Sequence, residues 1–425
     1  MDKQTPTCTH SFINDVTRRK FCLASGLFAF FPFNPATARP LADKVIFSGV
    51  TQLGDDRDFA NIMPFTSDIM KKTTSRGQRV IDAAFRNALK KYPPNNLTLT
   101  DPDASLEKDD ALVLAAALNF EYMGNFVSSA HGGDSYNYLF IELYGQALLV
   151  DLANVKIVQS YPFRIYTAGY KVEGQISNEK KKKAFEDFVL GENWIKGDPV
   201  SVVFAKKIQN LPFNADEDRS YLQVQSISLK KRAKKTLRSL SVDPDRYGRI
   251  LGYTVSASLS EQLLFPVLPY KIDRTVGGVM TSQFGDATGA NELKNNDADY
   301  GVDVILRGFK TVMVKETKYA KYILTVAYVR IIVRDINREK IVFDQKIRSK
   351  TPEPRMMLKR FDDTWNIYQQ LVIRLFDNFA QTAGDPTVDN IKNKCHIKKP
   401  AKIDIAFQQF KELKIIIDEC RGNKL

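Results

Sequence analysis

The chain has 425 residues, 44% of them hydrophobic and 26% charged, which is typical of a globular protein large enough for two or three domains. No stretch beyond the first forty residues is apolar enough to span a membrane, so the composition excludes a helical membrane protein. Lysine and arginine outnumber aspartate and glutamate by 62 to 49, and the resulting charge of +13 at pH 7 favours anionic partners.

The N-terminal segment carries the pattern of an export signal. Arg18 and Arg19 follow a polar leader, and an apolar run extends from Cys22 to Phe33. This arrangement resembles a twin-arginine signal peptide, with Cys22 at a position often held by leucine. The phenylalanine-rich core also suits the general secretory route, so the sequence leaves the route open.

Small residues follow the apolar run in the pattern cut by a signal peptidase, at Ala36-Thr37-Ala38 and at Pro40-Leu41-Ala42. We therefore expect residues 1–42 to be a signal peptide that is cleaved near Ala38 or Ala42. The mature chain is then periplasmic or secreted, has no transmembrane span, and is not expected to bind nucleic acid.

Removal of this leader would leave Cys395 and Cys420 as the only thiols of the mature chain. An even pair of cysteines in an oxidising compartment favours a disulfide. Such a bond would close a C-terminal loop and stabilise the fold by roughly 3 kcal/mol. The alternative is two unpaired, buried thiols.

Residues 43–240 are predicted to form a first α+β domain. Its strands are indicated by β-branched and aromatic runs, and its helices by apolar periodicity and capping residues. In chain order we expect a strand at 45–47, a helix at 78–92 capped by Ser75, strands at 97–100 and 111–122, a long hairpin at 138–172, helices at 177–190 and 198–211, and a strand at 221–229.

The long hairpin recurs later in the chain. Tyr138–Arg164 aligns without a gap with Tyr322–Arg348, and each copy predicts a long strand, a turn that begins at an aspartate, and an Ile-Val strand. Chance would give roughly one or two identical pairs. The seven identical pairs are Tyr138/Tyr322, Tyr144/Tyr328, Asp151/Asp335, Lys156/Lys340, Ile157/Ile341, Val158/Val342 and Arg164/Arg348. We infer an internal duplication: two similar domains, each a mixed sheet with a long antiparallel hairpin packed by helices.

A basic run followed by proline and aspartate turn residues at 241–245 predicts the boundary between the two domains. The second α+β domain is therefore placed at 241–385, and a helical C-terminal extension at 386–425. The elements expected there are strands at 262–270 and 301–309, a helix-and-loop region at 277–296, the second hairpin, and helices at 364–380 and 405–420.

The element order resembles a domain shared by envelope proteins of Gram-negative bacteria. The residues that carry the likeness are Ala298-Asp299-Tyr300 before a strand, and strands ending in Val150-Asp151 or Arg334-Asp335 before a turn to Lys-Ile-Val. The family includes the N-terminal domain of TolB, the curli secretion lipoprotein CsgG, the activator lipoprotein LpoB and the flagellar protein FlgT. The chain departs from it in having two such domains, no acylated cysteine and no β-propeller. The resemblance implies a non-enzymatic envelope role, and no functional residue can be transferred.

Two basic segments are the candidate binding residues. One is Lys180, Lys181, Lys182 and Lys183, and the other is Lys230, Lys231, Arg232, Lys234 and Lys235. Either segment is a solvated helix face, or it contacts anionic lipid head groups or an acidic polymer, where each basic residue contributes about 1 kcal/mol. Few aromatic residues lie between the lysines, which disfavours nucleic-acid stacking.

The sequence offers little for catalysis. Beyond the leader the chain has two histidines, His131 and His396, and neither has the spacing of a catalytic triad or of a zinc site. No phosphate-binding or dinucleotide-binding motif is present, so we predict no cofactor, no metal and no catalytic residue.

We therefore predict an exported, non-enzymatic binding or scaffold component of a bacterial cell envelope, with an envelope protein as partner. The alternative is a periplasmic hydrolase with its site in the cleft between the domains. A hydrolase should show a pocket with convergent, perturbed acids, whereas a scaffold should show an exposed apolar patch or sheet edge. A periplasmic solute-binding protein is disfavoured by the antiparallel hairpins.

Overall fold

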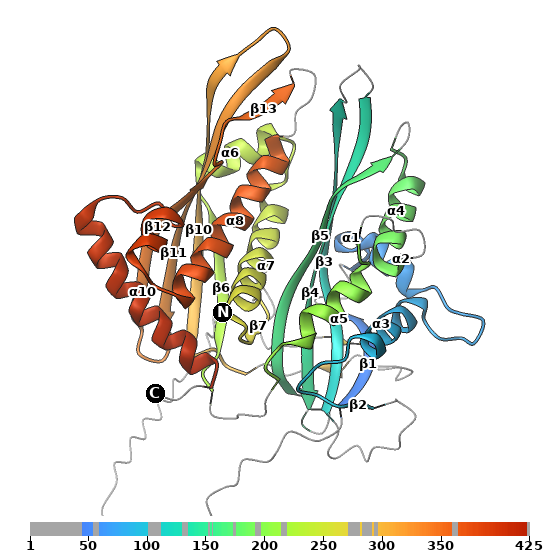
Figure 1. The fold of residues 1–425 in the computed structure, drawn as a ribbon. Coiled ribbons are helices and arrows are strands. Elements are labelled where there is room, and N and C mark those ends of the chain that lie inside the picture. The colour runs from blue at the N-terminus through green and yellow to red at the C-terminus, as the bar shows by residue number, and fades with distance from the viewer. Residues whose placement is uncertain are drawn as a thin grey trace, which may run out of the picture. The chain divides into compact units, whose positions relative to one another are not determined.

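A computed structural model of the chain describes most residues after position 44 (Figure 1). The described residues are 45–53, 59–100, 112–129, 135–151, 154, 156–172, 176–191, 197–213, 219–270, 281–282, 291–292, 296–358 and 364–422. The predicted export signal, with Arg18 and Arg19 and the cleavage sites near Ala38 and Ala42, lies outside these residues.

Five strands form the first sheet, in the order β2-β1-β3-β4-β5 (Figure 1). They are β1 (Val45–Gln52), β2 (Leu99–Thr100), β3 (Leu112–Ser129), β4 (Ser135–Asp151) and β5 (Lys156–Val172). β1 runs parallel to β2 and β3, whereas β3, β4 and β5 pair antiparallel. β4 and β5 are the first predicted hairpin.

The second sheet repeats this plan, in the order β12-β11-β10-β6-β7, with β13 paired to β11. Its strands are β6 (Leu222–Leu229), β7 (Val267–Leu268), β10 (Tyr300–Glu316), β11 (Ala320–Asp335), β12 (Lys340–Lys350) and β13 (Arg355–Leu358). β6 runs parallel to β7 and β10, and β10, β11 and β12 pair antiparallel. The predicted α+β fold with two similar sheets is confirmed. A separate pair consists of β8 (Thr281–Ser282) and β9 (Asn291–Glu292).

Corresponding residues of the two sheets also have corresponding partners. Tyr144 lies opposite Arg164 in the first hairpin, and Tyr328 lies opposite Arg348 in the second. Three β-bulges recur at matching positions in the two sheets. The extra residues are Ser48 and Gln225, Asn119 and Arg307, and Val158 and Val342. Bulges are specific local features, so their coincidence supports the internal duplication beyond the likeness of two hairpins.

The recurring aspartates close the hairpin turns. Asp151 Oδ1 accepts a hydrogen bond from the Asn154 backbone N–H at 3.1 Å, and Asp335 Oδ1 accepts one from the Arg338 backbone N–H at 2.9 Å. The donor is three residues after the aspartate in both copies. The prediction that these aspartates serve the turns is confirmed.

Helices pack on specific faces of the two sheets. α3, α4 and α5 pack on one face of the first sheet, and α8 and α10 pack on one face of the second (Figure 1). α7 contacts β5 of the first sheet as well as β6 of the second and α8. The helices are α1 (Phe59–Ile62), α2 (Pro64–Met70), α3 (Val80–Lys91), α4 (Asn178–Leu190), α5 (Val200–Gln209), α6 (Lys231–Ser239), α7 (Pro244–Leu263), α8 (Thr364–Gly384), α9 (Val388–Asn393) and α10 (Pro400–Cys420).

The second sheet begins before the predicted domain boundary at residue 240. β6 pairs with β10 and β7, so the second sheet begins at Leu222. The basic run expected to link the domains is helix α6, whose Ala233 and Leu237 are buried in the core of the second sheet. The C-terminal extension is helical as predicted, and α10 packs against β12 and α8.

Helix starts were predicted with mixed success. Ser177 caps α4 by accepting from the Lys180 backbone N–H, as expected. Ser75 does not cap α3, which begins after Arg79. α7 was not expected at all, although Asp243 caps it by accepting from two backbone N–H groups.

The expected disulfide is not formed, because Cys395 and Cys420 are both free and buried. Cys395 Sγ lies 3.6 Å from Thr382 Oγ1, and Cys420 ends α10. Each thiol occupies its own place in the apolar core and behaves as a small hydrophobic side chain. Burial raises the pKa of Cys395 to about 12, so its reactive thiolate is scarce at neutral pH.

Reducing agent should therefore leave the melting temperature of the protein unchanged. Cys395 and Cys420 should react with an aromatic disulfide reagent only after the chain is unfolded. A lower melting temperature in reductant, with neither thiol titrating in the denatured, unreduced protein, would show that the two cysteines form a disulfide.

Two further expectations concern a helix-and-loop region and the absence of a transmembrane helix. Most of the helix-and-loop region predicted at 277–296 lies outside them, apart from β8 and β9. Of the helices that are described, none is both long and apolar enough to cross a membrane.

Candidate functional site

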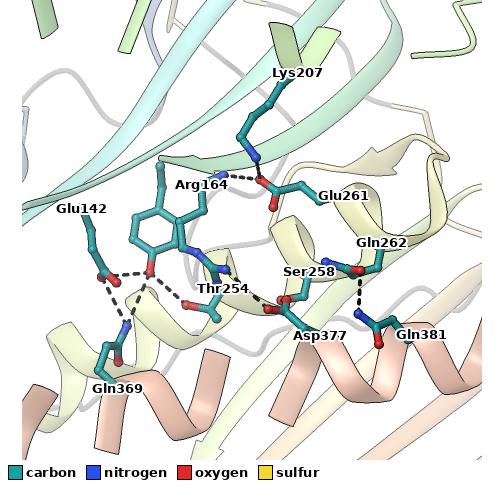
Figure 2. A network of polar contacts seen from close by, with 11 residues as sticks. Glu142, Arg164, Lys207, Thr254, Ser258, Glu261, Gln262, Gln369, Asp377 and Gln381 are labelled. Atoms are coloured by element: carbon teal, nitrogen blue, oxygen red, sulfur yellow. Dashed lines mark hydrogen bonds and ion pairs between the residues drawn. The ribbon is translucent and has the colours of Figure 1, made fainter. Parts of the chain in front are cut away.

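A buried polar network lies where the first sheet meets α7 and α8 (Figure 2). Glu142 and Tyr144 are on β4, and Arg164 lies opposite Tyr144 on β5. All three side chains are almost completely buried. Gln369 of α8 donates to Glu142 Oε2 at 3.2 Å, and Tyr144 Oη lies 3.1 Å from Thr254 Oγ1 of α7. The first sheet is therefore joined to both helices by polar contacts inside an apolar core.

Glu142 lies in the apolar interior within this network. Tyr144 Oη donates to Glu142 Oε2 at 3.1 Å, and Thr254 Oγ1 donates to the Ile250 carbonyl at 2.8 Å. Burial raises the pKa of Glu142 to about 7, and the hydrogen bonds from Tyr144 and Gln369 oppose that rise. The Glu142 carboxyl group is therefore harder to ionise than that of an exposed glutamate.

Arg164 carries the positive charge of the network. Its guanidinium lies 3.7 Å from Asp377 Oδ2 on α8, and Asp377 Oδ1 accepts from Ser258 of α7 at 2.7 Å. Glu261 Oε1 accepts from the Arg164 backbone N–H and from Lys207 Nζ, both at 2.8 Å. Burial raises the pKa of Asp377, and the neighbouring Arg164 opposes that rise.

The network contains acids with raised pKa values, but neither of two surface pockets formed by described residues is lined by a residue of the network. The larger pocket, about 500 Å³, is bordered by α3 and β2 and includes Arg86 and Lys90 but no carboxylate, histidine or cysteine. The smaller one, about 10 Å³, is lined by Thr351, Ile367, Gln370, Leu371 and Arg374. No group of three metal-ligating side chains occurs in the described part of the chain. The geometry suits a structural clamp between elements.

The duplication makes the second sheet comparable with the first, residue by residue. Tyr328 and Arg348 correspond to Tyr144 and Arg164, yet Tyr328 is only half-buried and Arg348 is exposed. The described helices that pack on β11 and β12 lie on the opposite face, where Val329 and other alternating residues are buried. Among the described residues, the face that is covered in the first sheet is thus open in the second.

This open face mixes apolar and basic side chains. Leu324, Val326 and Tyr328 are half-buried along β11. The basic residues of the face are Lys310, Arg330, Arg334, Lys346, Arg348 and Lys350, and the acidic ones are Asp303 and Asp344. Asp344 pairs with Arg330 and Asp303 pairs with Arg334. Within the described part of the chain, no ion pair involves the other four basic residues, so the face is positively charged.

A second exposed feature is the end of the β10–β11 hairpin, residues 309–322, which we call the arm. β6 pairs with β10 only as far as Leu306, so the outer edge of β10 is unpaired beyond that point within the described residues. Four large apolar side chains of the arm are exposed: Val312 by 43%, Met313 by 53%, Val314 by 53% and Tyr319 by 71%. The arm is the exposed apolar sheet edge that distinguishes a binding protein from a hydrolase in our expectations.

The two predicted basic segments differ in their surroundings. On α4, Lys182 pairs with Asp68 at 2.7 Å and Lys183 pairs with Asp187 at 3.3 Å. Lys230, Lys231, Arg232, Lys234 and Lys235 belong to α6 or its N-terminal flank, and all but the half-buried Lys234 are exposed. No ion pair links this second segment to another described residue. α6 packs against β10 at the base of the arm.

Sequence reasoning missed the open face and the arm. The aligned repeats carried a signal for the open face, because Gln146 and Pro162 of the first copy correspond to Arg330 and Lys346 of the second. Of the two histidines, His131 lies outside the described residues. His396 is half-buried in a left-handed backbone conformation, and burial lowers its pKa.

Comparison with known proteins adds little. No protein-family model matches the chain, and no curated protein does. One matching solved structure is a crystal structure from Helicobacter pylori described as that of a neuraminyllactose-binding hemagglutinin homolog. It is 10% identical over 40% of this chain and 86% of that chain, with a TM-score of 0.23. At this TM-score the likeness supports no conclusion about fold or function.

Proposed function

We propose that this protein is an exported, non-enzymatic binding or scaffold component of a bacterial cell envelope. It docks a protein partner on the open face of the second sheet and contacts an anionic envelope surface through the basic segment at α6. The observation that carries the proposal is the difference between the repeats. One face of the first sheet is covered by α7 and α8, and the equivalent face of the second sheet is open.

The chemistry of the open face defines the partner. Leu324, Val326 and Tyr328 offer apolar area between unpaired basic side chains such as Lys346 and Arg348. The equivalent positions of the first sheet pack against helices, so a helix of the partner fits the same pleated surface. Charge complementarity requires acidic residues along that helix.

The experiment compares complexes from gently solubilised envelopes of cells that express the protein. The wild type should migrate in a discrete complex larger than the monomer, which has a mass of at most 48.2 kDa before the signal peptide is removed. The variant Lys346→Glu/Arg348→Glu should migrate as the monomer, because two exposed attractive charges become repulsive. The matched control Lys392→Glu/Lys402→Glu changes two exposed lysines of α9 and α10 and should leave the complex intact.

A monomeric wild type would overturn the proposal. The periplasmic hydrolase would then be the alternative to test, beginning with the acids of the buried network. An equal loss of complex in both double variants would show that net charge, and not the open face, holds the partner.

A further inference from the structure

We propose that the arm and α6 together form a device that binds the surface of an anionic lipid membrane. The arm inserts its apolar tip among the head groups, and α6 supplies the positive charge at its base. This proposal deepens the anionic-surface part of the proposed function. Apart from Lys310, it uses different residues from the open face that docks the protein partner.

The arm has the amphipathic character that interfacial insertion needs. Val312, Met313 and Val314 are consecutive and each exposes more than 40% of its surface, and Tyr319 follows across the turn. Lys310, Lys315, Lys318 and Lys321 surround them, and all four lysines are exposed. Lysines of this kind keep their charge in water while apolar neighbours enter the interface.

The base of the arm places α6 beside it. The Lys230 backbone N–H donates to the Leu306 carbonyl at 2.9 Å, immediately before the arm begins. Arg232 lies against Gly308 of β10. Ala233 and Leu237 anchor α6 in the core, which leaves Lys231, Lys235 and Arg238 exposed. Apolar insertion and electrostatic attraction therefore act at one end of the second sheet.

The other predicted basic segment serves as an internal control. α4 carries four consecutive lysines, but two of them pair with aspartates of the same chain. No large exposed apolar side chain belongs to α4. If binding depended on net charge alone, α4 and α6 would contribute equally to membrane binding. The proposal instead predicts that α6 contributes and α4 does not.

The test is flotation of the full chain with vesicles of phosphatidylglycerol mixed with phosphatidylcholine, and with vesicles of phosphatidylcholine alone. The wild type should float with the anionic vesicles and not with the neutral ones. The α6 variant Lys231→Ala/Lys235→Ala/Arg238→Ala should lower the partition coefficient about a hundredfold, since each basic residue contributes roughly a factor of five.

The arm variant Val312→Ser/Met313→Ser/Val314→Ser keeps every charge and should lower the partition coefficient by about tenfold or more, because it removes the inserted apolar area. The control Lys180→Ala/Lys181→Ala/Lys182→Ala removes as much charge as the α6 variant and should change it by less than about twofold. All substituted side chains are exposed or partly exposed, so the fold should persist.

Equal flotation with neutral vesicles would overturn the proposal. So would an equal loss in the α4 control, which would indicate attraction to net charge alone. Binding to soluble polyglutamate with no effect of the arm variant would assign an acidic polymer as ligand instead. None of these outcomes alters the protein-docking test, which depends on complex size and on the open face.

Discussion

Replacement of Arg164 by methionine should lower the free energy of unfolding by about 3–5 kcal/mol. Arg164 is 6% exposed and lies among Glu142, Glu261 and Asp377. Removing the cation deprives Asp377 of its ion-pair partner, whereas Glu261 keeps Lys207, and leaving a buried carboxylate unpaired costs more than the ion pair itself contributes. The methionine side chain fills similar volume, so cavity formation adds little.

The repeat provides a matched control for this substitution. Arg348 occupies the equivalent place opposite Tyr328, but its side chain is exposed on the open face. Arg348→Met should change the free energy of unfolding by less than about 0.5 kcal/mol. Urea denaturation of both variants measures the difference. Similar losses in the two variants would contradict the role given to the buried network.

The protein should lose stability as the pH rises from 5 to 8, and Glu142 should account for about 3 kcal/mol of that loss. Its pKa is raised by burial from 4.5 to about 7. The folded state therefore holds a proton that the unfolded state has released. The stabilising contribution is complete below pH 4.5 and is lost as the pH passes through the folded pKa.

Glu142→Gln isolates this contribution. The neutral amide keeps the size of the protonated side chain, and Gln369 can rotate its amide to accept a hydrogen bond from it. The variant should therefore be less stable than the wild type at pH 5 by at most about 1 kcal/mol. It should lose much less stability between pH 5 and 8. Parallel pH profiles for wild type and variant, measured by urea unfolding, would show that Glu142 does not titrate in this range.

Other carboxyl groups also contribute to the dependence of stability on pH. The raised pKa of Asp377 acts in the same direction as that of Glu142, again because of burial. Hydrogen bonds from Arg330 and Lys182 lower the pKa of Asp344 and Asp68, so these two groups lose their contribution as the pH falls. Both lie in partly exposed pairs that solvent screens, so their effect on the profile is small.

The hairpins were predictable because their sequence pattern is local and is repeated. Asp151 and Asp335 mark the turns, and Val158 and Val342 turn out to be the extra residues of matching bulges. Residues of the two hairpins correspond at a constant spacing along the chain, so the strand register and the bulge positions are the same in both copies. The α+β class and the duplication could therefore be inferred from a single chain.

α7 was not predictable from propensity. Its interior holds Gly248, Gly252, Ser256 and Ser258, which are poor or middling helix formers. The helix persists because it is buried on almost every side between the sheets, and packing overrides propensity there. The signal present is Asp243-Pro244, a capping aspartate with proline at the first helical position, but the same residues also suit a linker turn.

The candidate site depends on contacts that no local pattern encodes. Glu142 and Val326 occupy equivalent positions, and both alternate with buried residues along a strand. Which copy is covered is decided by α7 and α8, far away in sequence. The sequence predicts anionic partners for the basic segments, yet the pairing of Lys182 with Asp68 could not be anticipated from the α4 segment alone.

The most direct test of the docking account is photocrosslinking in living cells from the open face. A photoreactive amino acid replaces Val326 in one strain and Ile415, an exposed apolar residue of α10, in another. We predict one discrete protein adduct from position 326, absent in the Lys346→Glu/Arg348→Glu background, and no such adduct from position 415. Adducts from position 415 alone, or none from position 326, would contradict the open face as the docking site.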